Sequence, residues 1–249
     1  MQIAEPESPC TPITDSSGLA SVAKPPCRTP VCGSENLPCS VCCGKNARFL
    51  LAAGGRDYWR CSDCAATFLH PTQLPTIDAE YAHYLRHENS PEDLHYRRFL
   101  HRLAAPLLAR LPHRQSGLDF GCGPGPALDC MLREAGHEVA LYDPFFHRDS
   151  ATLLRTYDFV TCTEVVEHFH RPAEEFARLD ALLKPGGWLA IMTCFQTDDT
   201  RFAAWHYRRD PTHVVFYGAE TFIQLARCYD WHCEIPVKDV VLMRKGKRS

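Results

Sequence analysis

A glycine-rich segment near the middle of the chain constrains the fold more than any other feature. It reads Leu118-Asp-Phe-Gly-Cys-Gly-Pro-Gly125 and is followed by a helical pattern at residues 127–135. Glycine lets the backbone turn sharply and approach a ligand closely. The N–H groups at the start of the next helix face the same loop. The segment therefore predicts a strand, a ligand-binding loop and a helix, in that order.

Strand and helix signals alternate through the rest of this region. Strands are expected at residues 117–120, 138–142, 157–162, 188–194, 233–237 and 240–243, and helices at 127–135, 172–183 and 219–228. Another helix is expected to begin with Ser90 as its N-cap, to run to about Leu111 and to be kinked by Pro106. This alternation predicts an α/β fold with a doubly wound, mostly parallel, Rossmann-like sheet.

Two acids flank the glycine loop. Asp119 precedes the first glycine, and Asp143 ends the next predicted strand, where a carboxylate can bind the hydroxyls of a ribose. A nicotinamide-binding Rossmann domain also has a glycine-rich turn followed by an acid about twenty residues later. Three features argue against that class. The glycines are spaced G-x-G-x-G, Asp119 would repel a pyrophosphate, and Leu183-Lys-Pro-Gly-Gly-Trp-Leu189 ends a helix and starts a strand.

These motifs together resemble the class I S-adenosylmethionine-dependent methyltransferases over roughly residues 90–245. The resemblance implies a methyltransferase enzyme whose glycine loop holds the amino acid part of S-adenosyl-L-methionine and whose Asp143 binds the ribose. Phe145 would flank the adenine beside Pro144. The residues expected to bind the cofactor are Asp119, Gly121, Cys122, Gly123, Gly125, Asp143, Pro144 and Thr163.

The stretch after Asp143 departs from this family. Only fourteen residues separate Asp143 from Asp158, where the family usually places a helix, a strand and another helix. Elements of normal length do not fit into that stretch. We therefore predict that the third strand is lost, which leaves Asp149 as the candidate acid near the adenine.

The segment Thr161-Cys-Thr-Glu-Val-Val-Glu-His168 carries acids and a histidine. If a helix begins at Thr163, Glu164, Glu167 and His168 share one face. The segment resembles ubiquinone-biosynthesis O-methyltransferases and small-RNA ribose O-methyltransferases, in which E-x-x-E-H and a later histidine bind a magnesium-like ion. The resemblance implies a second divalent metal, Mg²⁺ or another ion, held by Glu164, Glu167, His168 and His213. Such an ion lowers the pKa of a bound hydroxyl.

Two other interpretations of this segment stay open. His168 and Glu167 are candidate catalytic residues even without a metal, with His168 as a general base. Alternatively, the pair only starts a helix and packs there. Tyr81, Tyr84, His206 and Tyr207 are expected either to shape the acceptor pocket or to pack in the core.

Two C-x2-C pairs precede this region. Cys39-Ser-Val-Cys42 and Cys61-Ser-Asp-Cys64 are separated by eighteen residues, a spacing that indicates four thiolate ligands around one tetrahedral zinc. We predict a small zinc ribbon at residues 39–70 with a structural Zn²⁺, although Cys43 could compete with Cys42 for the metal.

The remaining segments complete the predicted organisation. Residues 1–38 are rich in Pro, Ser and Thr and are expected to form a flexible tail with unpaired thiols at Cys10, Cys27 and Cys32. Residues 71–115 are expected to form linker and cap helices. Residues 116–245 are expected to form the methyltransferase domain.

Composition narrows the function classes. The net charge of −3 argues against nucleic acid and anionic membranes as partners. The chain has no signal-peptide pattern or spanning apolar run, so we expect a cytoplasmic protein in which the fourteen cysteines are metal ligands or buried residues. The first expectation is methylation of a hydroxyl on a small molecule. The alternatives are C- or N-methylation of a sugar or another metabolite, RNA methylation, and a non-catalytic binding module.

Overall fold

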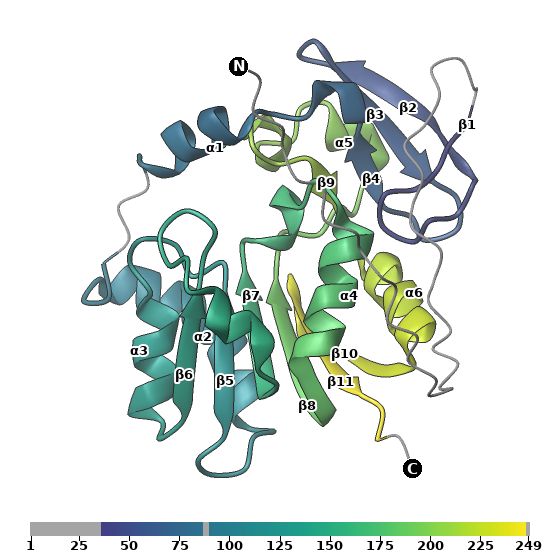
Figure 1. Cartoon of the computed structure of the whole chain (residues 1–249). Coiled ribbons are helices and arrows are strands. Elements are labelled where there is room, and N and C mark those ends of the chain that lie inside the picture. Colours follow the sequence, from purple (N-terminus) through teal and green to yellow (C-terminus); the bar gives the residue numbers. More distant parts are fainter. Residues whose placement is uncertain (1–35, 87–89, 248–249) are drawn as a thin grey trace, which may run out of the picture.

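The computed structural model describes residues 36–86 and 90–247. Most of the predicted tail, including Cys10, Cys27 and Cys32, lies outside the described residues. The described part contains two β-sheets, a six-stranded one in the order β10-β11-β8-β7-β5-β6 and a five-stranded one in the order β1-β2-β3-β4-β9 (Figure 1).

The six-stranded sheet is the core of the predicted Rossmann-like fold. Its strands are β5 (Ser116–Phe120), β6 (Glu138–Tyr142), β7 (Tyr157–Thr163), β8 (Leu183–Met192), β10 (Trp231–Val237) and β11 (Val240–Lys245). The first four strands pair in parallel, whereas β11 runs antiparallel to β8 and β10 antiparallel to β11. The prediction of a mostly parallel α/β sheet is therefore confirmed.

Helices cover both faces of this sheet. They are α2 (Leu94–Leu108), α3 (Ala127–Glu134), α4 (Pro172–Leu182) and α6 (Ala219–Tyr229). Alternate residues of a strand point to opposite faces. Accordingly, Phe159 of β7 packs in the apolar cluster that contains α2 and α3, while Val160 packs in the cluster that contains α4 and α6. The sheet is thus doubly wound.

The edge at β6 confirms the expected loss of a strand. Between β6 and β7, the described chain forms only the short 3₁₀ helix η2 (Ser150–Leu154). Since β6 has one partner, β5, it is an edge strand.

The helix predicted from Ser90 begins later and ends earlier than expected. It starts at Leu94 because Asp93 accepts hydrogen bonds from the N–H groups of His95 and Tyr96. Ser90 Oγ instead accepts a hydrogen bond from the Glu92 N–H within the preceding turn. The helix ends at Leu108, and Pro106 lies inside its last turn as predicted.

The second sheet contains three strands of the predicted ribbon and two strands from outside its predicted range. Its strands are β1 (Asn36–Leu37), β2 (Ala47–Ala53), β3 (Arg56–Cys61), β4 (Thr67–Leu69) and β9 (Val215–Phe216). Strand β9 belongs to the predicted methyltransferase domain, and it pairs antiparallel with β4. The sheet therefore includes β1 and β9 in addition to the strands within residues 39–70.

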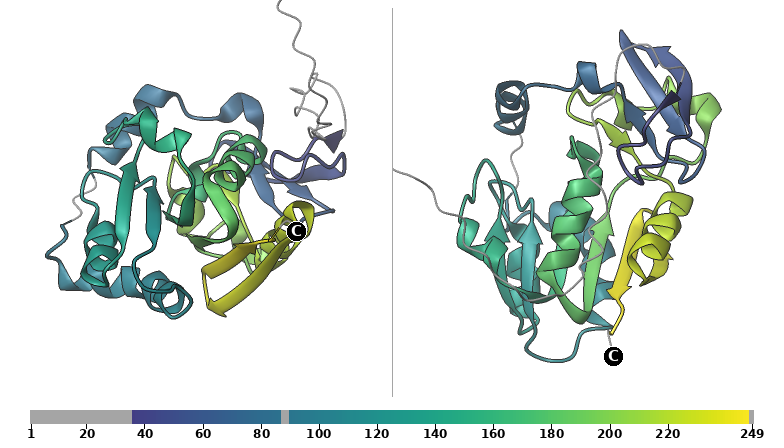
Figure 2. Two further views of the ribbon diagram at one scale, coloured as in Figure 1. Left: turned by 60° about the horizontal axis from the view of Figure 1, so that its bottom comes forward. Right: turned by 45° about the vertical axis from the view of Figure 1, so that its right-hand side comes forward.

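Shorter helical elements lie between these strands and helices along the chain. They are η1 (Pro71–Gln73), α1 (Ile77–Tyr84), η3 (Val166–His168), α5 (Asp199–Phe202) and η4 (Tyr207–Arg209). Helix α1 lies above the carboxyl ends of the parallel strands, beside the ribbon sheet (Figures 1 and 2). None of the described helices is long and apolar enough to cross a bilayer.

Candidate functional site

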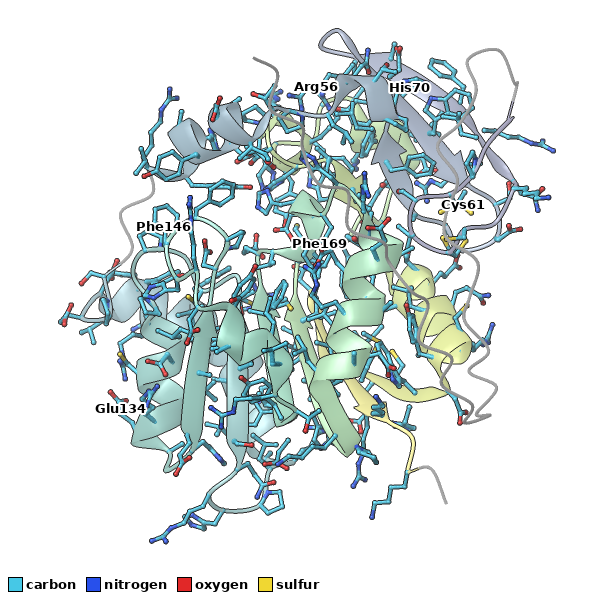
Figure 3. All side chains as sticks on the ribbon, viewed as in Figure 1. Arg56, Cys61, His70, Glu134, Phe146 and Phe169 are labelled. Atoms are coloured by element: carbon cyan, nitrogen blue, oxygen red, sulfur yellow. The ribbon has the colours of Figure 1, made fainter. Side chains whose placement is uncertain are left out.

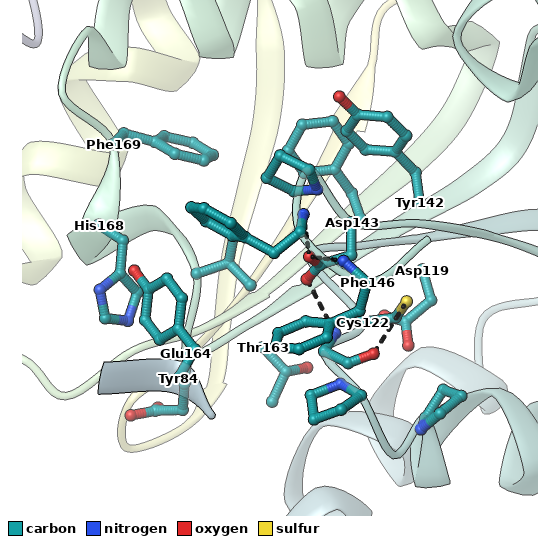
Figure 4. A pocket seen from close by; sticks show the side chains of 18 of the residues that line it. Tyr84, Asp119, Cys122, Tyr142, Asp143, Phe146, Thr163, Glu164, His168 and Phe169 are labelled. Carbon is teal, nitrogen blue, oxygen red and sulfur yellow. Dashed lines mark hydrogen bonds between the residues drawn. The ribbon is translucent and has the colours of Figure 1, made fainter. Parts of the chain in front are cut away.

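A cavity of about 880 Å³ opens at the carboxyl ends of β5, β6 and β7, beneath α1. Ligands of open α/β sheets bind at this end of the strands. Figure 3 shows Phe146, which follows β6, and Phe169, which follows η3, at this end of the sheet. The predicted residues that line the cavity are Tyr84, Asp119, Gly121, Cys122, Gly123, Asp143, Pro144, Phe145, Thr163, Glu164, His168 and His213. Figure 4 labels Asp119, Asp143 and His168 among them. Gly125, predicted to bind the cofactor, is not among the lining residues.

The glycine loop has the backbone geometry that its sequence predicts. Gly121 and Gly123 have φ angles of +79° and +67°, which strain residues with a side chain. A Cβ on Gly121 would also come within 2.5 Å of the Val165 side chain. Two contacts fix the loop. The Gly121 N–H donates to the Tyr142 carbonyl at 2.7 Å, and the Gly123 N–H donates to Asp143 at 3.0 Å.

Asp119 lies at the floor of the cavity. Its carboxylate is buried and accepts a hydrogen bond from Thr161 Oγ1 at 2.7 Å. Burial raises the pKa of Asp119 to about 7. The Thr161 hydrogen bond lowers the pKa, while the nearby carboxylates of Asp129 and Asp143 raise it further. A cationic ligand group would favour the charged form of this carboxylate.

Asp143 holds the turn after β6. Its Oδ1 accepts hydrogen bonds from the N–H groups of Phe145 at 2.8 Å and Phe146 at 3.0 Å, while Oδ2 accepts from Gly123. The carboxylate therefore joins the glycine loop to the turn that carries two aromatic rings. Oδ1 already accepts two hydrogen bonds, whereas Oδ2 accepts one and can accept a further one from a ligand hydroxyl.

Asp149, the candidate acid near the adenine, does not lie in the cavity. It is exposed and caps η2 by accepting from the Ala151 N–H at 3.0 Å. Glu175 of α4 lines the cavity instead, and its ionic partner is Arg178. Sequence reasoning missed this acid, because it lies on α4, outside the motifs that predict the cofactor site.

Helix α1 forms a roof with two aromatic side chains. Tyr81 stacks on Phe145 with ring centroids 5.8 Å apart, and Tyr84 contacts His168 edge-on at 5.4 Å. Figure 4 shows Tyr84 and His168 next to each other. Of the four residues predicted to shape the acceptor pocket, only Tyr84 lines the cavity. His206 is exposed, and Tyr207 is buried.

Polar pairs tie α1 to the opposite wall. Glu80 Oε1 lies 3.1 Å from His170 Nε2, and His83 Nε2 lies 3.1 Å from Asp210 Oδ2. Burial opposes ionisation of Asp210, but the Thr212 hydrogen bonds and the His213 and His83 rings outweigh burial and lower its pKa to about 2. Sequence reasoning missed Asp210, although it lies three residues before His213.

The helix predicted from Thr163 does not form. The Glu164 N–H donates to the Met192 carbonyl at 2.8 Å, which extends the pairing of β7 with β8. Glu164 then takes a left-handed conformation with φ +53°, and only residues 166–168 form the short 3₁₀ helix η3. Glu164 therefore does not share a helical face with Glu167 and His168.

Three of the four predicted metal ligands nevertheless come together. One ligand atom each from Glu167, His168 and His213 lies within 4.8 Å of the other two. We call these residues the acid–histidine triad. Glu164 is outside this group, with its Oε2 at 3.1 Å from Tyr207 Oη.

Backbone carbonyls fix the tautomers of both histidines. His168 Nδ1 lies 3.1 Å from the Thr212 carbonyl, and His213 Nδ1 lies 2.7 Å from the Tyr207 carbonyl. Since a carbonyl oxygen can only accept, each Nδ1 carries the proton and each Nε2 carries the lone pair in the neutral ring. This second hydrogen bond is typical of histidines that ligate metals.

Glu167 and Glu164 share the buried hydroxyl of Tyr207. Tyr207 Oη donates to Glu167 Oε1, whereas Glu167 Oε2 is buried without a hydrogen-bond partner. Burial and the charge of Glu164 raise the pKa of Glu167 well above its usual value. Burial likewise raises the pKa of Glu164 to about 7, against the Tyr207 hydrogen bond. A cation beside these carboxylates would reverse both shifts.

The four ribbon cysteines also converge. Cys39 Sγ and Cys64 Sγ lie 3.6 Å apart, and Cys42 Sγ and Cys61 Sγ lie 3.7 Å apart. Four Zn–S bonds of about 2.3 Å in a tetrahedron require sulfur separations of about 3.8 Å. The cluster has the spacing of a closed zinc site. Cys43, the possible competitor, is not part of the cluster and has φ +60°.

Comparison with known proteins gives curated relatives of one kind. The similar proteins include the ubiquinone biosynthesis O-methyltransferase of Burkholderia multivorans, with 50% identity over 38 residues, which cover 15% of this chain and 16% of the relative. The enzyme of Serratia proteamaculans with the same name is 31% identical over 91 residues, which cover 36% of this chain and 38% of the relative. The mitochondrial enzyme of Schizosaccharomyces pombe is 28% identical over 134 residues, which cover 44% of this chain and 49% of the relative. The matches span at most about half the length of these relatives.

A solved structure and a sequence family also match. The structure is the Burkholderia thailandensis 1,6-didemethyltoxoflavin-N1-methyltransferase with bound 1,6-didemethyltoxoflavin and S-adenosylhomocysteine. It has a TM-score of 0.47 and 17% identity over 81% of this chain and 99% of that chain. The family, described as a methyltransferase domain, matches residues 81–234, which is more than half of the chain. The chain therefore belongs to the methyltransferase domain family.

Proposed function

We propose that the protein is an S-adenosylmethionine-dependent methyltransferase that methylates a hydroxyl of a small molecule. The observation that carries the proposal is one cavity that joins the glycine loop to the acid–histidine triad, through His168 and His213. A cofactor held by the loop and a hydroxyl held beside the triad would share this space. The O-methyltransferase relatives support oxygen as the acceptor atom.

The loop residues fit the cofactor. Asp119 would hold the ammonium of its amino acid part, and Asp143 would accept hydrogen bonds from the ribose hydroxyls. Gly123 leaves open space for the close approach of the ligand, whereas Gly121 makes room for the Val165 side chain. S-adenosylmethionine supplies an activated methyl group when bound, so the chain contributes mainly by bringing the acceptor oxygen into line.

The triad fits a divalent metal. Its donor set contains a buried carboxylate oxygen that lacks a hydrogen-bond partner and two histidines whose Nε2 carries the lone pair. Glu167, His168 and His213 would hold the ion, with Glu164 nearby as a candidate fourth ligand. The ion would lower the pKa of an acceptor hydroxyl. Two imidazoles beside one carboxylate suit Mn²⁺, Fe²⁺ or Zn²⁺ as well as Mg²⁺.

Without a metal, His168 is the candidate general base. It lines the cavity, and the Thr212 carbonyl holds its Nδ1 proton, so Nε2 can accept the proton of an acceptor hydroxyl. This second mechanism differs from the first in one respect, since it does not require the carboxylate of Glu167 to bind a cation.

The cysteine cluster supports a structural Zn²⁺ held by Cys39, Cys42, Cys61 and Cys64. A bound zinc ion would favour the thiolate form of these cysteines, because zinc binds the deprotonated thiol. The set is closed by four protein ligands, a property of structural zinc sites. We also propose residues 39–70 as the ribbon, completed by β9, and residues 116–245 as the methyltransferase domain.

The test is a set of methylation assays that measure S-adenosylhomocysteine release. Acceptors with two neighbouring hydroxyls, one hydroxyl, or an amine in the same position are compared on one aromatic scaffold. We expect turnover of the neighbouring hydroxyls, loss of turnover in Glu167→Gln, and retained cofactor binding in that variant. Turnover of the amine alone would contradict the hydroxyl acceptor. Full activity of Glu167→Gln would remove the metal and leave His168 as the base.

A further inference from the structure

One segment of the chain belongs to both the ribbon sheet and the acid–histidine triad. We call residues 207–216 the shared segment. Tyr207 and His213 face the triad. Tyr207 donates to Glu167, and His213 is a triad member. The Val214 N–H donates to the Glu167 carbonyl at 2.9 Å on the same side. The segment thus supplies one triad histidine and the hydroxyl that orients the triad carboxylate.

The ribbon holds the same segment from its other side. Phe68 and Thr67 of β4 pair with Val215 and Phe216 of β9, and the Leu69 N–H donates to the Val214 carbonyl at 2.8 Å. Arg56 of β3 donates to the Pro211 carbonyl at 2.8 Å. Hydrogen bonds from the ribbon therefore reach Pro211, two residues before His213, and Val214, directly after it.

Arg208 is the side chain that connects the ribbon to the shared segment at its start. Its guanidinium is buried, and it donates to the Ala53 carbonyl at 3.3 Å and to Tyr58 Oη at 3.2 Å. It also lies over the Tyr58 ring at 5.6 Å and donates twice to the Ala203 carbonyl. Because Arg208 follows Tyr207 directly, these contacts fix the backbone whose carbonyl accepts from His213 Nδ1.

The cofactor side has a different set of supports. The glycine loop bonds to Tyr142 and Asp143, and Asp119 bonds to Thr161, all within the six-stranded sheet or the turn after β6. The ribbon is therefore tied to the triad by hydrogen bonds that the loop does not share.

We propose that the zinc ribbon positions the triad, and that Arg208 is the positioning residue that couples them. The ribbon sets where His213 and Tyr207 lie, so it controls metal and acceptor binding but not cofactor binding. This inference rests on the metal site of the proposed function. Supporting hydrogen bonds around metal ligands control metal affinity in this manner.

The test compares Arg208→Gln with Arg110→Gln in the full chain. Arg110 is a matched control, because its guanidinium also lies over an aromatic ring, Trp188 at 5.9 Å, and also donates to a backbone carbonyl, that of Pro106. It connects α2 to β10 through Glu234, away from the cavity. Binding of Mn²⁺ alone is measured by electron paramagnetic resonance, binding of S-adenosylhomocysteine alone by calorimetry, and zinc content by elemental analysis.

We expect Arg208→Gln to weaken Mn²⁺ binding about tenfold or more, as removal of a supporting hydrogen bond does. S-adenosylhomocysteine affinity and zinc content should stay as in the unchanged protein, and Arg110→Gln should alter neither affinity. If Arg208→Gln loses its zinc, Arg56→Gln is used instead, because it removes only one hydrogen bond to the shared segment. We again expect weaker Mn²⁺ binding and unchanged S-adenosylhomocysteine binding.

The contrary outcomes separate the inference from the proposed function. If the unchanged protein binds Mn²⁺ and His168→Ala abolishes that binding, the triad is a metal site. Equal Mn²⁺ affinities in Arg208→Gln, Arg56→Gln and Arg110→Gln would then overturn the coupling alone. If the unchanged protein does not bind Mn²⁺ at the triad, the metal site fails and the coupling fails with it. Equal losses of Mn²⁺ and S-adenosylhomocysteine binding would show general destabilisation and would also overturn the coupling.

Discussion

The two halves of the cavity differ in how the chain builds them. The cofactor half comprises Asp119, the glycine loop and Asp143, which lie within 25 consecutive residues and two adjacent parallel strands. The acceptor half is assembled from α1, the end of β7, η3 and the shared segment, whose residues are up to about 130 positions apart. The first half depends on local backbone geometry, whereas the second depends on how the ribbon packs on the main sheet.

The largest expected effect on the cofactor half is that of a substitution at Asp143. In Asp143→Ala, the ribose loses its acceptor and the turn loses three hydrogen bonds. Hydrogen bonds to a charged group are worth roughly 1.5–3 kcal/mol each, so S-adenosylhomocysteine affinity should fall about 100-fold. Calorimetry checks this value, with Asp149→Ala as the control because Asp149 is exposed and only caps η2. If Asp149→Ala loses as much S-adenosylhomocysteine affinity as Asp143→Ala, then Asp149 lies near the adenine of the cofactor, as the sequence predicts.

The acceptor half should respond separately to Glu167→Gln. The amide keeps the shape but removes the charge that would face a cation, so Mn²⁺ affinity should fall about 10- to 100-fold. S-adenosylhomocysteine affinity should not change, because the glycine loop has no contact with Glu167. Titrations with each ligand alone measure the two effects. A joint loss would show that the halves are not independent.

This difference also explains what could be predicted from the sequence. The positions of Asp119 and Asp143 follow from the strand–loop–helix pattern, because Asp119 lies near the end of β5 and Asp143 directly follows β6, beside the loop. Gly125 belongs to the motif of the loop, but it is not among the residues that line the cavity, and its carbonyl accepts from the Ala127 N–H. Loss of the third strand could be predicted because chain length limits what fits after Asp143.

The acceptor half was harder to predict because its geometry is not local. Helical periodicity placed Glu164 with Glu167 and His168, but pairing with β8 and the left-handed turn at Glu164 overrode it. His213 is predicted as a metal ligand only through the resemblance to a family. Arg208 carried no motif, and its role depends on a strand, β9, that is two residues long and joins a sheet formed some 150 positions earlier. Such contacts have no periodic signature.

The pH dependence of cofactor binding tests the role of the Asp119 carboxylate in the cofactor half. Burial raises the pKa of Asp119 to about 7, so the carboxyl is protonated below that pH and charged above it. A cationic ammonium favours the charged form. Affinity for S-adenosylhomocysteine should therefore rise about tenfold from pH 6 to pH 8. Asp119→Asn should bind more weakly with a flat profile in calorimetry. A profile that falls with pH would contradict this role for Asp119.

Tyr207→Phe should give the smallest effect, and it tests the hydroxyl by which the shared segment contacts the triad carboxylate. The change removes the hydroxyl that bonds Glu167 and lies 3.1 Å from Thr193 Oγ1, but it keeps the ring 4.1 Å from His213. One hydrogen bond is worth about 1 kcal/mol, so Mn²⁺ affinity should fall roughly fivefold. S-adenosylhomocysteine titrations should match the unchanged protein. A loss as large as that of Glu167→Gln would mean that Tyr207 itself holds the ion, so the acceptor half would depend on the shared segment for two ligands rather than one.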